Sequence, residues 1–260
     1  MKRVKTVALG AVVISSICVT QAEAQVTVST GADYSSGSYG TGQRIRTASA
    51  SVAVRVKRKR VSAFATLPVV RTEAPGNVVV TGGPLGLPIL VDPTRPAMRV
   101  RRDGLGDATL GASVQLLEPR LHKLALAVGG SAKLPTASAA KGLGTGKADF
   151  AVTAEIARPG KVTPFAAIGH TAVGQPAEYR LNDVTSMRGG LALRVGKASE
   201  VSLSYNHASP VNDAIPGRRE IATGIETALS QRLSLGVQGG AGLSRGAPDA
   251  SAGLRLGLRM

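Results

Sequence analysis

Short and long connectors alternate between twelve candidate β-strands along this chain. The short connectors are residues 58–60, 118–120, 158–161, 196–198 and 230–232. The long ones are residues 35–42, 68–103, 135–145, 174–183, 208–217 and 244–249. Tight turns at one end of an antiparallel sheet and long loops at the other are typical of bacterial transmembrane β-barrels. The pattern therefore predicts an all-β fold, a transmembrane antiparallel up-and-down barrel of about 12 strands over residues 25–260, with a long outer loop near residues 68–103.

The candidate strands alternate between apolar and polar residues, as expected where one face meets lipid and the other meets a lumen. In the last strand, Leu254, Leu256 and Leu258 alternate with inward Arg255 and Arg259. An even number of strands returns the chain to its starting side, so both ends of the barrel are expected in the periplasm. Five aromatic residues near strand ends are expected to form an interfacial girdle: Tyr34, Phe64, Phe150, Phe165 and Tyr205. A soluble β-sandwich is the alternative, because it also shows one-sided alternation.

Residues 1–24 have the order of a secretory signal peptide. A basic start is followed by an apolar run from Val7 to Val19 and by the cleavage site Ala22-Glu23-Ala24. Cys18 lies inside this segment, so the exported chain would have no disulfide and no cysteine-based metal or redox site. We therefore expect export through the inner membrane to the outer membrane of a Gram-negative cell. The expected partners there are outer-membrane lipid and the barrel-assembly machinery.

The chain is strongly basic, with 32 Lys and Arg against 16 Asp and Glu. Such an excess often indicates nucleic-acid binding. An exported chain with 32 Gly, no Trp and 3% aromatic residues offers neither a base-stacking platform nor a recognition helix, so no nucleic-acid partner is expected. The three histidines, His122, His170 and His207, are isolated, so neither a metal site nor a cofactor is expected.

Three motifs follow one another in a fixed order. Gly104-Leu105-Gly106-Asp107 begins a strand, Lys133-Leu134-Pro135-Thr136 ends one, and Leu143-Gly144-Thr145-Gly146 lies in the loop that follows. Together they resemble the motifs of the family named for the MetA pathway of phenol degradation, although Ala137 stands where that family has glycine. The resemblance extends over about residues 104–260. It implies an outer-membrane barrel with a transport role, and it brings no catalytic or binding residues.

The charged residues expected on the inner face of the strands suggest which solutes the lumen would select. The inward set is Arg55, Lys133, Arg188, Arg194, Arg232, Arg255 and Arg259, against Asp107, Glu155 and Glu226. An excess of cations along a pore favours anions. We therefore expect a passive channel for small polar or anionic solutes, and the family's name suggests aromatic acids. In the alternative, Arg and Glu pair across strands and fill the lumen of a non-conducting structural barrel.

One constellation suggests an enzyme instead. His207 and Ser209 are two residues apart at the outer end of a strand, so they would lie on the same face, and Glu220 lies across the next loop. Outer-membrane lipid hydrolases resemble this in using a His-x-Ser pair and a third polar residue, which fixes the tautomer of the imidazole that takes the serine's proton. Glu220 has inward parity and Pro210 follows the serine, and both features count against catalysis. We therefore expect no enzyme and retain an outer-leaflet lipid hydrolase as an alternative.

Overall fold

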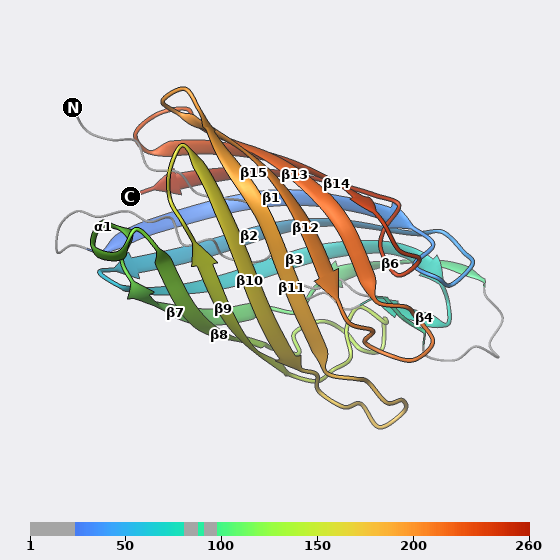
Figure 1. Ribbon diagram of the computed structural model, residues 1–260. Coiled ribbons are helices and arrows are strands. Elements are labelled where there is room, and N and C mark those ends of the chain that lie inside the picture. Colours follow the sequence, from blue (N-terminus) through green and yellow to red (C-terminus); the bar gives the residue numbers. More distant parts are fainter. Residues whose placement is uncertain (1–23, 81–87, 91–97) are drawn as a thin grey trace.

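Long antiparallel strands form a barrel in the computed structural model, which describes residues 24–80, 88–90 and 98–260 (Figure 1). Apart from Ala24, the expected signal peptide lies outside the described residues. One short helix is present among the described residues, α1 (Pro119–His122). The strands are β1 (Gln25–Gly37), β2 (Ile45–Arg58), β3 (Val61–Pro75), β4 (Val78–Val80), β5 (Pro88–Leu90), β6 (Arg99–Leu105), β7 (Thr109–Leu117), β8 (Ala125–Lys133), β9 (Asp149–Ala157), β10 (Val162–Ala172), β11 (Val184–Val195), β12 (Ser199–Ala208), β13 (Arg218–Ala228), β14 (Leu233–Gly242) and β15 (Ala250–Arg259). In this described part of the chain, no helix is long and apolar enough to cross a bilayer.

The sheet closes on itself because β1 pairs with β2 on one side and with β15 on the other. At the seam, the N–H of Met260 donates to the carbonyl of Val26 at 2.9 Å. β6 and β7 are consecutive and both pair with β3, so together they make one crossing of the barrel. The predicted 12-strand antiparallel barrel is confirmed.

Side chains alternate between an apolar outer face and a polar inner face. Along β2, the outward Val52, Val54 and Val56 are 54%, 39% and 40% exposed, and Arg55 lies between them on the inner face. In a sandwich, a second sheet would bury one of these faces. Of the three buried apolar clusters in the described part of the chain, two lie in the long connectors and the adjoining strand ends, for example Val173, Leu181 and Val184. The third consists of Ala125, Ala157, Phe165 and Ala192, which lie on neighbouring strands near the short turns and are not covered by a second sheet. The exposed outer face is the surface that a barrel presents to lipid.

Short turns and long connectors lie at opposite ends of the barrel (Figure 1). The end with the short turns carries α1 and the carboxyl terminus. There, Arg60 Nε lies 2.6 Å from Glu118 Oε1, which links the turn before β3 to the connector before β8. We call this the inner end and the other the outer end, following the general orientation of outer-membrane barrels.

The long outer connector is shorter than the expected residues 68–103, because β3 continues to Pro75 and β6 begins at Arg99. Pro68 does not end the strand. β3 pairs with β7 as far as Thr66 and with β6 from Val69, so Pro68 lies at a gap in the ladder where its missing N–H costs little. Within the connector, β4 pairs with β5 in a small antiparallel hairpin.

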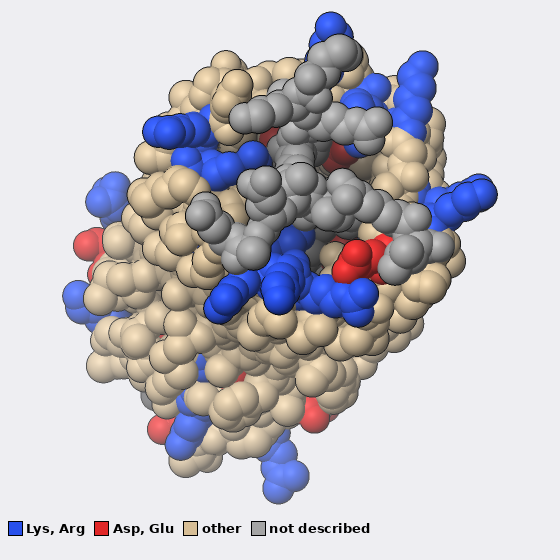
Figure 2. Space-filling view, turned by 90° about the vertical axis from the view of Figure 1, so that its left-hand side faces the viewer, with Lys and Arg blue, Asp and Glu red and all other residues tan. Residues whose placement is uncertain are grey.

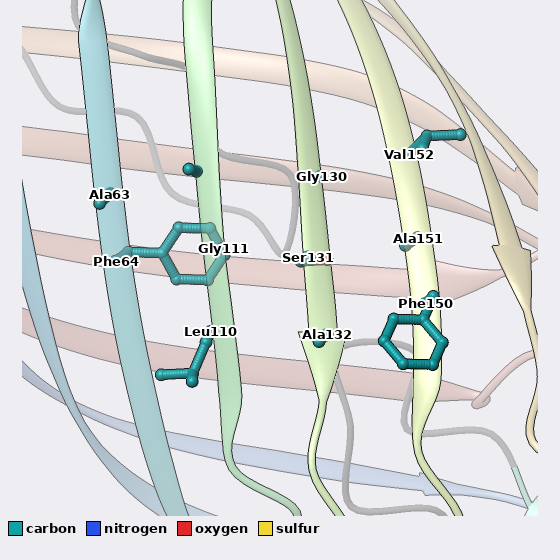
Figure 3. Close-up of a pocket in the computed structure, with 11 residues that line it drawn as sticks. Ala63, Phe64, Leu110, Gly111, Gly130, Ser131, Ala132, Phe150, Ala151 and Val152 are labelled. Carbon is teal, nitrogen blue, oxygen red and sulfur yellow. The ribbon is translucent and has the colours of Figure 1, made fainter.

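Two of the five aromatic residues expected in the girdle face the lumen instead. Tyr34, Phe150 and Tyr205 do lie on the outer face, 47%, 62% and 45% exposed. Phe64 and Phe165 have the opposite parity, and each ring covers a glycine of a neighbouring strand. Figure 3 shows the Phe64 ring lying over Gly111. A Cβ added at Gly111 would lie 2.5 Å from Phe64, and one at Gly190 2.7 Å from Phe165. The rings turn inward because these glycines leave space that an aromatic side chain fills.

Candidate functional site

The inner faces of β15, β1 and β2 form a cationic wall of the lumen. The wall also carries the carboxylate of Asp33 on β1, which accepts a hydrogen bond from Gln238 of β14 at 3.0 Å. Arg55 on β2 and Arg255 on β15 both face inward and lie close enough to repel each other. The Arg55 guanidinium lies 5.6 Å from the centre of the Phe64 ring, and its Nη1 donates to Ser62 Oγ at 3.4 Å. Within the described ranges, neither arginine has a carboxylate partner.

The opposite wall carries arginines whose charges are compensated. β11 lies six strands from β2 in either direction around the barrel. There Arg188 is attracted by Glu155 on β9 and Glu220 on β13, and it lies 5.2 Å from the centre of the Phe165 ring. Glu220 accepts hydrogen bonds of 3.0 and 2.6 Å from Arg218. The two walls therefore differ in net charge.

Near the inner end, three charged residues follow one another around the barrel. Arg194 is the cross-strand partner of Glu200, which in turn is the partner of Glu226. Glu200 was not among the inward charged residues expected from the sequence, although its parity with Ser202 could have identified it. Arg232, expected on the inner wall, lies exposed in the turn before β14 because that strand begins only at Leu233.

Basic side chains predominate over acidic ones on the inner end of the barrel (Figure 2). Exposed basic residues of its turns include Arg58, Lys59, Arg60, Lys123, Arg158, Lys161, Lys197 and Arg232. Like charges gathered around an opening raise the local concentration of counter-ions. The described surface at this end of the barrel therefore has a positive potential.

Lys133 and Asp107 face inward but are buried, so they do not line an open path. Lys133 Nζ lies 3.0 Å from Asp107 Oδ2 and 3.0 Å from Asp149 Oδ2, and the Lys133 and Asp107 side chains are 4% and 0% exposed. Asp107 Oδ1 also accepts a hydrogen bond from the N–H of Ala137 at 3.0 Å. The connector that follows β8 covers the group, and its Leu143 is buried. This cluster fixes the connector to the barrel wall.

The residues suggested for lipid hydrolysis do not assemble. His207 pairs with Arg219 and Glu220 with Asn206, so the histidine faces outward and the glutamate inward, where Arg218 holds it. Ser209 Oγ accepts a hydrogen bond from the N–H of Thr185 at 2.9 Å. A carboxylate on the other face of the sheet cannot orient the imidazole. Among the described residues, no group of three or more His, Cys, Asp or Glu side chains is placed to hold a metal ion.

The outer surface has a shallow groove of about 670 Å³ between β3 and β9 (Figure 3). Its lipid-facing rim includes Leu110, Phe150 and Val152, which are 46%, 62% and 63% exposed. The floor is lined by small residues such as Ala112 and Gly130. The groove lies on the apolar outer face, so it is not part of the lumen site.

A profile of the family described as "Putative MetA-pathway of phenol degradation" matches residues 27–260. The chain belongs to this family. The match includes the three motifs and every strand of the barrel from Thr27 onward, so it confirms the family indicated by the sequence.

Solved structures show the same fold at low sequence identity. An outer membrane channel from Pseudomonas putida F1 has a TM-score of 0.70 and 14% identity, covering 96% of this chain and 100% of that chain. The NanC porin has a TM-score of 0.53 and 7% identity, covering 88% and 97%. No curated protein matches the chain in sequence. The family and the barrel fold place the protein in the Gram-negative outer membrane.

Proposed function

We propose that the barrel is a passive channel for small polar and anionic solutes. The main support for this proposal is the pair Arg55 and Arg255. Both positive charges face the lumen, and neither has a carboxylate partner among the residues that the structure describes. In a dry interior, two such charges would be very costly. Water in the lumen would solvate them, and an anion passing between the strands would reduce their repulsion.

Charge asymmetry across the lumen supports selection for anions. Arg188 and Arg218 on the opposite wall are close to carboxylates, so they contribute little net potential. Arg55 and Arg255 are not compensated in this way. The excess of basic side chains around the inner end adds to the same sign of potential (Figure 2). Cations that line a pore stabilise anions within it.

Planar-bilayer recording of the double variant Arg55→Ser/Arg255→Ser tests the proposal. A change of about one kT in lumen potential alters anion and cation concentrations about 2.7-fold in opposite directions, so the anion-to-cation permeability ratio should fall roughly sevenfold. Arg219→Ser is the matched control, because Arg219 is exposed on the outward face of β13, away from both the lumen and the inner end. Its selectivity should equal that of the wild type.

Two results would contradict this function. If the folded wild-type protein gives no conductance in repeated insertions, the barrel is closed. Inward pairs such as Arg188–Glu155 and Gln238–Asp33 would then fill the interior of a non-conducting structural barrel. If the barrel conducts but Arg55→Ser/Arg255→Ser leaves the permeability ratio unchanged, the cationic wall does not line the path.

Aromatic carboxylates are the finer candidate within this proposal. The inward Arg55 and Phe64 place a guanidinium beside an aromatic ring, which suits a solute with a carboxylate and a ring of its own. We expect Phe64→Leu to lower the permeability to benzoate relative to acetate while leaving that to chloride unchanged. Reversal potentials in mixed salts measure these ratios, and equal losses for benzoate and acetate would argue against a role for the ring.

A further inference from the structure

The outer surface of β3 changes from apolar to charged within one step along the strand. Its outward Leu67 and Val69 are 46% and 53% exposed, and the next outward residue is the exposed Arg71. The neighbouring β6 makes the same change after Leu105, which is 50% exposed. Four outward arginines lie beyond this step, and we call them the outer arginine patch: Arg46, Arg71, Arg99 and Arg101.

Strand register brings the patch together on one face. Arg46 of β2 and Arg101 of β6 are both cross-strand partners of Glu73 on β3. Arg71 is the partner of Asp103, and Arg99 that of Pro75. Cross-strand partners point to the same side of a sheet, so the arginines share the outward face with Leu67 and Val69.

Positive charge exceeds negative charge on this face, where the four arginines lie beside two acidic residues, Glu73 and Asp103. Glu73 Oε2 lies 3.7 Å from Arg46 Nη1 and 3.6 Å from Arg99 Nη2, so one carboxylate serves two arginines. For Arg71 and Arg101, no ion pair or side-chain hydrogen bond occurs within the described segments. Exposed ion pairs of this length contribute little free energy, so all four guanidinium groups remain available to a stronger anion.

The patch lies where the head groups of the outer leaflet are expected. The apolar outward run from Val61 to Val69 on β3 covers about 26 Å of strand, and strand tilt reduces this to roughly 20 Å of the ~25 Å apolar band of such barrels. Arg71 therefore follows directly on the hydrocarbon layer at the end with the long connectors. The outward residues near the outer ends of β9, β10 and β12 are instead Phe150, His170 and His207.

We propose that the outer arginine patch binds the phosphate groups of the phosphorylated glycolipid of the outer leaflet. Guanidinium groups bind phosphate through two parallel hydrogen bonds, and several of them on one rigid sheet suit a lipid with more than one phosphate. The acyl chains of the same lipid would lie along Leu67, Val69 and Leu105. This site requires only the barrel and its place in the membrane, and it is independent of whether the lumen conducts.

Binding of diphosphorylated lipid A to the detergent-purified protein, measured by native mass spectrometry, tests the site. We expect Arg71→Gln/Arg101→Gln to weaken binding about tenfold or more, because each substitution removes a charged donor that would bind a phosphate oxygen. The matched control Arg158→Gln/Lys161→Gln removes two exposed cations at the inner end and should change binding less than about twofold. Fully dephosphorylated lipid A should bind the wild type weakly and show no response to either variant.

A second variant keeps the test decisive if the double variant folds poorly. Glu73→Gln leaves all four arginines in place and removes the carboxylate that engages two of them, so it should tighten lipid A binding. The proposal is overturned if Glu73→Gln weakens binding, or if the folded Arg71→Gln/Arg101→Gln variant and the inner-end control lose equal affinity. It is also overturned if dephosphorylated lipid A binds as well as the diphosphorylated form, or if equimolar inorganic phosphate displaces the lipid, which would indicate a site for free anions.

Discussion

At the residue scale, the three sequence motifs meet around one buried ammonium group. Asp107 comes from the first motif and Lys133 from the second, and Asp149 follows the third. Thr136 of the second motif accepts a hydrogen bond from the N–H of Ala108 at 2.8 Å and donates one to the carbonyl of Gly106 at 2.8 Å. A Cβ at Gly144 would lie 3.0 Å from Asp107 Oδ2, so only glycine leaves room for the carboxylate there. Each motif therefore supplies a part of one structural cluster.

Replacing Lys133 with Met should destabilise the folded barrel by about 3–5 kcal/mol, because it leaves the fully buried Asp107 without its cation. Urea unfolding in lipid vesicles measures the loss. Lys141→Met is the control, since Lys141 is exposed in the same connector and should cost little. A stability of Lys133→Met within about 1 kcal/mol of the wild type would show that the ion pairs do not hold the connector.

At the scale of elements, neighbouring outer connectors pack backbone against backbone. Gly246, between β14 and β15, approaches the connector between β12 and β13 so closely that an added Cβ would lie 1.8 Å from the carbonyl oxygen of Pro216. Gly217 O would lie 2.8 Å away. Backbone atoms cannot move aside as the end of a side chain can, so this contact fixes the relative position of two connectors.

Gly246→Ala should therefore cost about 1–3 kcal/mol of stability, with faster amide hydrogen exchange in both connectors. Gly76→Ala is the control, because its nearest contact would be an ordinary 3.5 Å from Met98 O. If exchange in Gly246→Ala changes only around residue 246, the two connectors open independently and the contact does not couple them.

The sequence identified the strands far better than their ends. Period-two alternation and connector length were sufficient for the twelve crossings, because a lipid face requires apolar residues at every second position. Pro68 was misleading, since its tolerance depends on a gap in pairing between β6 and β7 that only the assembled sheet creates. Parity placed Arg55 and Arg188 on the inner face, yet it could not show that Lys133 is buried, because a distant connector covers it. The pore-lining role of the inward arginines stays a prediction.

At the scale of the whole molecule, the orientation of the barrel can be tested by labelling. The sequence has one cysteine, Cys18, which lies within the expected signal peptide. A thiol label on the exported protein would therefore attach only at an introduced cysteine. Arg180→Cys lies in the outer connector between β10 and β11, and Lys197→Cys in the short turn between β11 and β12. A maleimide attached to a polymer too large for the lumen should label Arg180→Cys in intact cells, and Lys197→Cys only after the outer membrane is permeabilised. The reverse pattern would mean that the barrel is inserted the other way.

The pairing of β1 with β15 sets the order in which the barrel is completed. All other pairs join consecutive crossings, so these hairpins can form while later parts of the chain are still unfolded. Thr27 of β1 can pair with Arg259 only after β15 has formed. Until then, β1 and the most recently added strand both have unpaired backbone edges. Joining the most distant strands also has the largest loop-closure entropy, so this step is expected to be the slowest. An open intermediate of this kind is the form of the protein that is most exposed to misassembly with other chains.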